Sequence, residues 1–166
     1  MMAKNHVALG VAAWCLIAAP MGVFTFTTAA VAAAGSLLPD IDHPKSQIAN
    51  IRVGRIKPLL PVALVVSALV GHRGVTHSLI AVVALLALLI AYTANSGMAA
   101  HAHVAALVIG YLSHIAGDSL TPSGVPLLWP RSKTYSVKMF RTNSIIETII
   151  TWIICTCASV IYFTQK

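Results

Sequence analysis

Long apolar runs, separated by short polar segments, constrain the fold of this chain more than any other feature of its sequence. Hydrophobic residues make up 58% of the 166 positions and charged residues only 9%. A soluble domain carries roughly 25% charged residues. The sequence therefore predicts an integral membrane protein of the all-α class, with a single domain over residues 1–166.

The spacing of the apolar runs predicts a polytopic bundle of about five crossing helices. Crossing helices are expected at 7–19, 21–38, 79–94, 98–118 and 145–163. The first two should form a hairpin that turns at Pro20, and Asn95 to Gly97 should form a second turn. Pro122, Pro126 and Pro130 exclude a continuous helix from the segment 119–143.

The apolar run 58–71 is an exception. It has 14 residues, which makes a helix of about 21 Å against a hydrocarbon core of about 30 Å. We expect a short re-entrant or tilted helix that returns to the side it left. The segment 79–94 should continue a helix that begins near His77.

The net charge of +7 comes from two basic clusters rather than from an even distribution. The clusters consist of Lys45, Arg52, Arg55 and Lys57, and of Arg131, Lys133, Lys138 and Arg141. Basic residues that flank membrane helices are retained in the cytoplasm, so we expect both loops there and no nucleic-acid partner. The cysteines lie within apolar runs without metal-binding spacing, and we interpret them as packing residues.

Acidic and histidine residues recur at the ends of the apolar runs. In this topology they gather at the cytoplasmic face, whereas His101 and His103 fall near the opposite end. The candidate metal ligands are His6, Asp40, Asp42, His72, His77, His114, Asp118 and Glu147. Imidazole and carboxylate together suit a divalent metal, with zinc favoured over manganese or iron. The alternative is a buried polar network without a metal.

Spacing suggests how these ligands converge. His114 and Asp118 are four residues apart and share one helix face. Asp40 and Asp42, two apart in an extended segment, should project to the same side, where one carboxylate binds metal directly and the other bridges, binds a second ion or orients a histidine. Gly74 allows His72 and His77 to point to a common centre.

Two further residues have alternative interpretations. Arg73 is expected to contact a phosphate oxygen of the substrate, and its alternative is a snorkelling interfacial arginine. Glu147 follows Ser144 with the spacing of a helix capping box, so it is either a ligand or a cap.

Three motifs resemble the YdjM-type family of bacterial inner-membrane proteins, which are described as metal-dependent hydrolases. The motifs are Gly35–Pro44, His72–Ser78, and His114–Asp118 followed by Thr121–Val125. The family is in turn similar to zinc-dependent phospholipase C and related nucleases, which are helical enzymes with His, Asp and Glu around zinc. The resemblance implies a multi-pass protein of the bacterial inner membrane with a related helical fold.

The function expected from these features is hydrolysis of a phosphoester. The metal would activate water, Arg73 would hold the phosphate and Asp42 would accept a proton. A site at headgroup depth points to membrane lipids as partners and to a lipid or other amphipathic substrate. The alternatives are a metal-stabilised scaffold or regulatory protein, and a metal transporter. A transporter is disfavoured because its ionisable residues should lie in mid-membrane.

Overall fold

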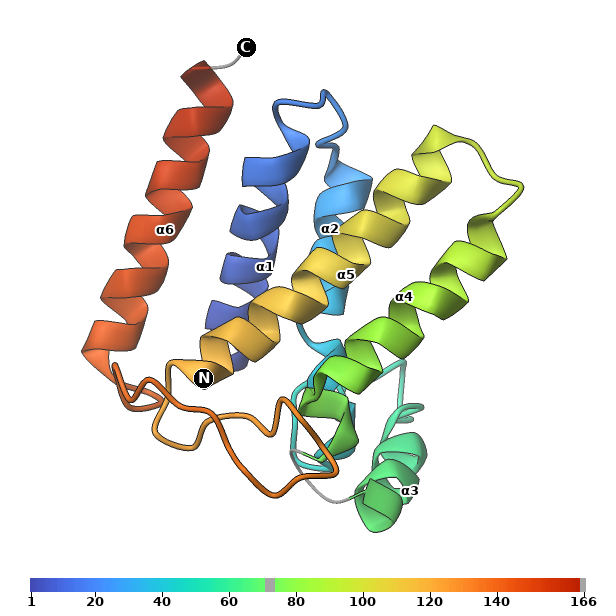
Figure 1. Cartoon of the computed structure of the whole chain (residues 1–166), viewed down its shortest axis with the longest axis vertical. Coiled ribbons are helices and arrows are strands. Elements are labelled where there is room, and N and C mark those ends of the chain that lie inside the picture. The colour runs from blue at the N-terminus through green and yellow to red at the C-terminus, as the bar shows by residue number, and fades with distance from the viewer. Residues whose placement is uncertain (71–73, 165–166) are drawn as a thin grey trace.

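The chain forms a bundle of helices that lie side by side (Figure 1). The computed structural model describes residues 1–70 and 74–164, and only helices occur as regular elements among them. The α-helices are α1 (Ala3–Ala18), α2 (Phe26–Gly35), α3 (Leu60–Val70), α4 (Leu79–Thr93), α5 (Met98–Ser119) and α6 (Ile145–Thr164), and the short 3-10 helices are η1 (Leu38–Asp42) and η2 (Val75–His77). The prediction of an all-α fold is confirmed for these residues.

Two of the described helices are long and apolar enough to cross a membrane. They are α5, with 22 residues, and α6, with 20 residues. Helices α1 and α4 are shorter, with 16 and 15 residues, and α3 has only 11. The expected bounds of α5 and α6 and the short helix within 58–71 agree with the structure, whereas five crossings remain a prediction.

Helix α2 is much shorter than the apolar run 21–38. The turn at Pro20 is present, but the helix begins only at Phe26, so the prediction of a helix from residue 21 is wrong. Thr25 starts the helix because its side chain accepts a hydrogen bond from the Thr28 backbone, and the Thr28 side chain bonds back to the Thr25 backbone. Pro39 stands at the start of the tighter helix η1, which follows α2.

Two local predictions around the candidate ligands are also wrong. Asp40 and Asp42 lie in the 3-10 helix η1 rather than in an extended segment, so residues two apart point in different directions. Helix α4 does not continue from His77, because Ser78 adopts an extended conformation and its side chain caps the helix at Ala81.

Glycines allow the central helices to approach closely. A Cβ on Gly110 of α5 would lie 2.1 Å from the Ala32 oxygen of α2, and a Cβ on Gly35 would lie 2.2 Å from the Leu107 oxygen. Such contacts leave room for hydrogen only, as in membrane helix pairs built on small residues. Helix α5 contacts α1, α2 and α4, and α6 contacts α1.

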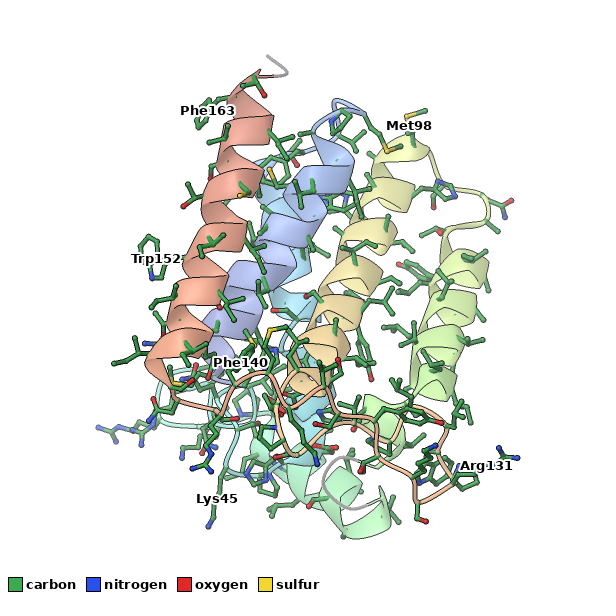
Figure 2. All side chains as sticks on the ribbon, turned by 60° about the vertical axis from the view of Figure 1, so that its left-hand side comes forward. Lys45, Met98, Arg131, Phe140, Trp152 and Phe163 are labelled. Atoms are coloured by element: carbon green, nitrogen blue, oxygen red, sulfur yellow. The ribbon has the colours of Figure 1, made fainter. Side chains whose placement is uncertain are left out.

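The two ends of the bundle differ in chemistry. Figure 2 shows Lys45 and Arg131 at one end and Met98 and Phe163 at the other. Helices η1 and η2 and the loop 119–143 lie at the basic end (Figure 1). The loop is tied to the start of α4 by a hydrogen bond of 3.0 Å from the Leu79 nitrogen to the Leu127 oxygen. The chain thereby gathers its polar connections beside the first turn of α1 and the last turn of α5.

Candidate metal centre

Two histidine rings face each other at the basic end of the bundle. The Nε2 atoms of His77 in η2 and His114 in α5 are 3.3 Å apart, and both side chains are fully buried. His114 Nδ1 lies 2.7 Å from the Ser36 carbonyl oxygen. A carbonyl oxygen only accepts hydrogen bonds, so the proton of His114 is on Nδ1 and its Nε2 lone pair points at His77.

The hydrogen-bond partners of His77 Nδ1 determine the tautomer of His77 in the same way. Its Nδ1 atom lies 3.3 Å from Asp42 Oδ2 and 3.1 Å from Thr76 Oγ1. The Thr76 hydroxyl donates to the same Asp42 oxygen, so it can accept from Nδ1–H. Carboxylate partners of this kind fix the orientation of metal-binding histidines. Two Nε2 lone pairs therefore face one point without a proton between them.

Two carboxylates complete the surroundings of that point. Asp40 Oδ1 lies 3.9 Å from His77 Nε2 and 3.7 Å from His114 Nε2. Asp118 Oδ2 lies 3.9 Å from both. Ligands at zinc distances of 2.0–2.2 Å in a tetrahedron are about 3.3–3.6 Å apart. Asp40 Oδ1 and the two Nε2 atoms thus approach the spacing of three ligands around one ion.

Asp118 connects this point to His6. His6 Nε2 lies 3.2 Å from the other Asp118 oxygen, Oδ1, and the His6 ring stacks on His114 with centroids 3.7 Å apart. The positively charged Met1 amino group donates to the same Oδ1 atom at 2.5 Å and forms an ion pair with it. Two groups of potential ligands result, Asp40–His77–His114 and His6–His114–Asp118. Both groups contain His114, whose one unprotonated nitrogen binds a single ion, so they mark alternative positions for that ion.

Asp42 stands apart from both groups. It is fully buried and contacts the Nδ1 side of His77, away from the facing Nε2 atoms. The Tyr111 hydroxyl extends this arrangement by donating to the Thr76 backbone oxygen at 2.5 Å. Among the roles considered from the sequence, the geometry favours orientation of a histidine over direct ligation.

Glu147 binds backbone and amide donors. Its Oε1 accepts from Met2 N at 2.7 Å and from Asn5 Nδ2 at 2.6 Å, and its Oε2 accepts from Asn143 N at 2.7 Å. Its own backbone nitrogen donates to Ser144 Oγ at 3.2 Å. The first half of the expected capping box is present, and the carboxylate joins the start of α6 to the start of α1. Neither described ligand group contains Glu147.

The remaining histidines and Arg73 do not contribute to the described cluster. His72 and Arg73 lie outside the described residues. His101 and His103 are at the far end of α5, where their Nδ1 atoms lie 3.1 and 2.6 Å from carbonyl oxygens one turn earlier, consistent with their interpretation as non-ligands. Sequence reasoning assigned no role to Ser36, Thr76 or Tyr111. Ser36 and Thr76 lie within the motifs Gly35–Pro44 and His72–Ser78, and membership of these motifs was the only sequence feature that could have indicated their roles.

Comparisons with known proteins identify a family and three relatives that are similar in sequence to this chain. The family described as YdjM inner membrane protein matches residues 1–166. Inner membrane protein YdjM of Escherichia coli K12 and its namesake in Shigella flexneri are each 47% identical over 94 residues, which is 57% of this chain and 44% of theirs. The chain thus spans less than half the length of these relatives. No solved structure matches it.

A third relative matches over a longer range. Uncharacterized protein YvsG of Bacillus subtilis 168 is 32% identical over 151 residues, covering 90% of this chain and 87% of the relative. The family match over the whole chain confirms the family resemblance predicted from the sequence. The chain belongs to the YdjM family of inner membrane proteins.

Proposed function

We propose that this chain is a membrane-embedded metal-dependent hydrolase. The observation that supports the proposal is the pair of Nε2 lone pairs, 3.3 Å apart, in a buried site with two carboxylates. Two nitrogen lone pairs at this distance repel each other, and a cation between them would replace that repulsion by attraction. Zinc is the favoured ion because histidine nitrogens and carboxylate oxygens are among its usual ligands, and manganese or iron are alternatives.

The residues divide into ligands and supporting groups. Asp40, His77, His114 and Asp118 would hold the ion, and His6 would bind through or beside Asp118. A divalent metal in this position supplies Lewis acidity, which polarises a phosphoryl oxygen and lowers the pKa of water towards about 7. Asp42 holds the His77 ring in the ligating tautomer and increases its basicity. Arg73 binds a phosphate oxygen of the substrate.

The position of the site supports a lipid substrate. The cluster lies at the end of the bundle that carries both basic loops, which we assign to the cytoplasmic face. Asp40 is the most accessible ligand, with a side chain 22% exposed, whereas the side chains of His77, His114 and Asp118 are at most 2% exposed. The substrate would therefore approach past η1. A phosphoester at headgroup depth, in a phospholipid or other amphipathic molecule, is the class that fits this entrance.

Metal content tests the first half of the proposal. Purified protein should contain zinc, manganese or iron in a fixed ratio to the chain, measured by plasma mass spectrometry. His77→Ala or Asp118→Ala should lose the metal because each removes a buried ligand, and His103→Ala should retain it because its ring lies at the far end of α5. Unchanged metal content in the first two variants would show that the cluster is a polar network.

Turnover tests the second half. Metal-replete protein in lipid nanodiscs should hydrolyse a phosphoester among phospholipid, polyprenyl phosphate and nucleotide substrates. Arg73→Ala should reduce turnover far more than metal content, and Arg131→Ala in the second basic loop is the matched control. A lack of turnover on all three classes would exclude the phosphoesterase activity.

A metal-stabilised scaffold is the second candidate, and one observation favours it. The side chains of His77, His114 and Asp118 are almost completely buried, as in structural zinc centres, whereas a catalytic centre keeps an open position. Cobalt-substituted protein separates the two. Inorganic phosphate should change the visible absorption of cobalt if one position is open to exchange, and an unchanged spectrum would favour the scaffold.

A further inference from the structure

Helix α3 leaves one whole side uncovered. Figure 1 shows it at the basic end of the bundle, apart from the longer helices, and its main contact among the described elements is with η1. The exposed residues recur at helical spacing, so they share one side of the helix. They are all apolar, namely Pro61, Val62, Leu64, Val65, Ala68 and Leu69. A continuous apolar face of this kind marks a binding surface.

The length of α3 limits how it can meet a membrane. Its 11 residues span about 16 Å at 1.5 Å per residue, whereas the hydrocarbon core is about 30 Å thick. The helix therefore cannot cross. A short apolar helix beside basic residues binds at the boundary between headgroups and acyl chains instead.

The segment that leads into α3 is a tight hairpin. Val53 and Ile56 exchange backbone hydrogen bonds of 3.0 and 3.3 Å, and Gly54 between them has a φ of 63°, which glycine adopts without strain. The Lys57 ammonium donates to Asn50 Oδ1 at 2.8 Å. The hairpin is thereby attached at its base to the loop before it.

The hairpin exposes apolar and basic side chains together. Ile51, Val53 and Ile56 are 46%, 62% and 64% exposed. The arginines that alternate with them, Arg52 and Arg55, are also exposed. Apolar side chains between arginines are typical of segments that insert into the headgroup layer of a membrane.

Little acidic surface is available to neutralise these arginines. The chain has four acidic residues, and none lies between Asp42 and Asp118. Asp42, Asp118 and Glu147 are buried, and the Asp40 side chain is only 22% exposed. The charge of the hairpin is therefore complementary to an anionic surface.

We propose that the hairpin and α3, residues 51–70, form an anchor that binds an anionic lipid surface. Arg52 and Arg55 contact lipid phosphates, and the apolar face of α3 lies among acyl chains. The candidate spans α5 and α6 place a bilayer beside the anchor. Because α3 contacts η1, the anchor also sets the depth of Asp40 below the headgroups. Lipid binding here depends neither on a metal nor on hydrolysis.

Spin labels on the full chain, in vesicles of equal parts phosphatidylcholine and phosphatidylglycerol, test the depth of the anchor. A label at Leu69→Cys should be reached by oxygen and shielded from a water-soluble nickel chelate, because the Leu69 side chain is 78% exposed on the apolar face. Gln47→Cys is the matched control, because Gln47 is exposed in the preceding loop and should be reached by nickel. Equal access of nickel to both labels would overturn the proposal. So would magnetic coupling between Leu69→Cys labels, which would show that a second copy of the chain covers the face.

The headgroup preference is measured with a fluorophore at Val53→Cys and a quencher carried by phosphatidylglycerol or by phosphatidylcholine. Phosphatidylglycerol should quench more strongly at equal lipid fractions. Arg52→Gln with Arg55→Gln should reduce this preference severalfold, because each basic residue near an anionic surface contributes about fivefold. Arg131→Gln with Lys133→Gln is the matched control, since it removes the same charge from exposed positions in the other basic loop, and it should leave the preference unchanged.

Two results of the quenching experiment would overturn the proposal. Equal effects of the two double variants would show that net charge alone attracts the lipid. Equal quenching by both lipids in the protein with native arginines would show that the hairpin does not select an anionic headgroup.

Discussion

A single buried carboxylate determines what His77 can bind. Asp42 lies 3.3 Å from His77 Nδ1, and its negative charge keeps the proton on that side of the ring. The Nε2 lone pair is then available to a metal, and the ring becomes a stronger donor. The Thr76 hydroxyl and the Tyr111 hydroxyl hold this arrangement from behind.

Asp42→Asn is expected to weaken zinc affinity about 10- to 100-fold, the usual effect of removing a carboxylate behind a ligating histidine. The amide has the same shape but no charge, so the ring loses its electrostatic anchor. Competition titration against a zinc chelator measures the change, and circular dichroism verifies the fold. Affinity within twofold of the native value would contradict the role assigned to Asp42.

At the scale of the elements, close packing of α2 against α5 positions the ligands. Gly110 lies one turn before His114 on α5, and Gly35 precedes Ser36, whose carbonyl oxygen holds the His114 ring. The two glycines therefore set the distance at which this hydrogen bond forms. The contact between α2 and α5 and the orientation of the His114 ring therefore depend on the same two backbone segments.

Gly110→Ala should destabilise the bundle by about 1–3 kcal/mol, the usual cost of overpacking. The added Cβ would lie 2.1 Å from a backbone oxygen that has no room to move. Gly97→Ala is the matched control, because a Cβ there has nothing within 4 Å. Thermal unfolding in detergent measures both variants, and equal melting temperatures would show that α2 and α5 can separate without cost.

The elements also show where sequence reasoning is reliable. The bounds of α5 and α6 could be predicted because each helix coincides with a long apolar run. Such a run indicates a helix whether its side chains face lipid or other helices. The start of α2 is determined by reciprocal hydrogen bonds between Thr25 and Thr28. The hydrophobicity of the run 21–38 does not reveal this cap, so the helix was expected to begin too early. The 3-10 turn at Asp40 and Asp42 is decided by a proline and by tertiary contacts with η2.

For the molecule as a whole, the concentration of basic residues at one end of the bundle predicts a defined orientation in the membrane. Lys45 and Arg131 mark one end and Met98 the other (Figure 2). The grouping of His6, Asp40, His77, His114 and Asp118 was predictable because each lies at the end of an apolar run. The assignment of each nitrogen and oxygen was not, since it depends on side-chain rotamers and on turns too short to leave a periodic pattern.

Single cysteines in a background without native cysteines test the orientation. Gln47→Cys and Ser96→Cys are suitable because both positions are exposed and lie in connections at opposite ends. We expect an impermeant thiol reagent to label Ser96→Cys in intact spheroplasts, and Gln47→Cys only after lysis, because basic loops stay in the cytoplasm. Labelling in the reverse pattern would place the metal cluster outside the cell.

The metal cluster joins residues from four separate elements, α1, η1, η2 and α5, between His6 and Asp118. During synthesis, His6 leaves the ribosome long before Asp118 does. The coordination shell therefore cannot exist until most of the protein has been made and inserted. Under the proposed function, metal would be acquired late in maturation, and nascent chains stalled before residue 114 should show no uptake of radioactive zinc.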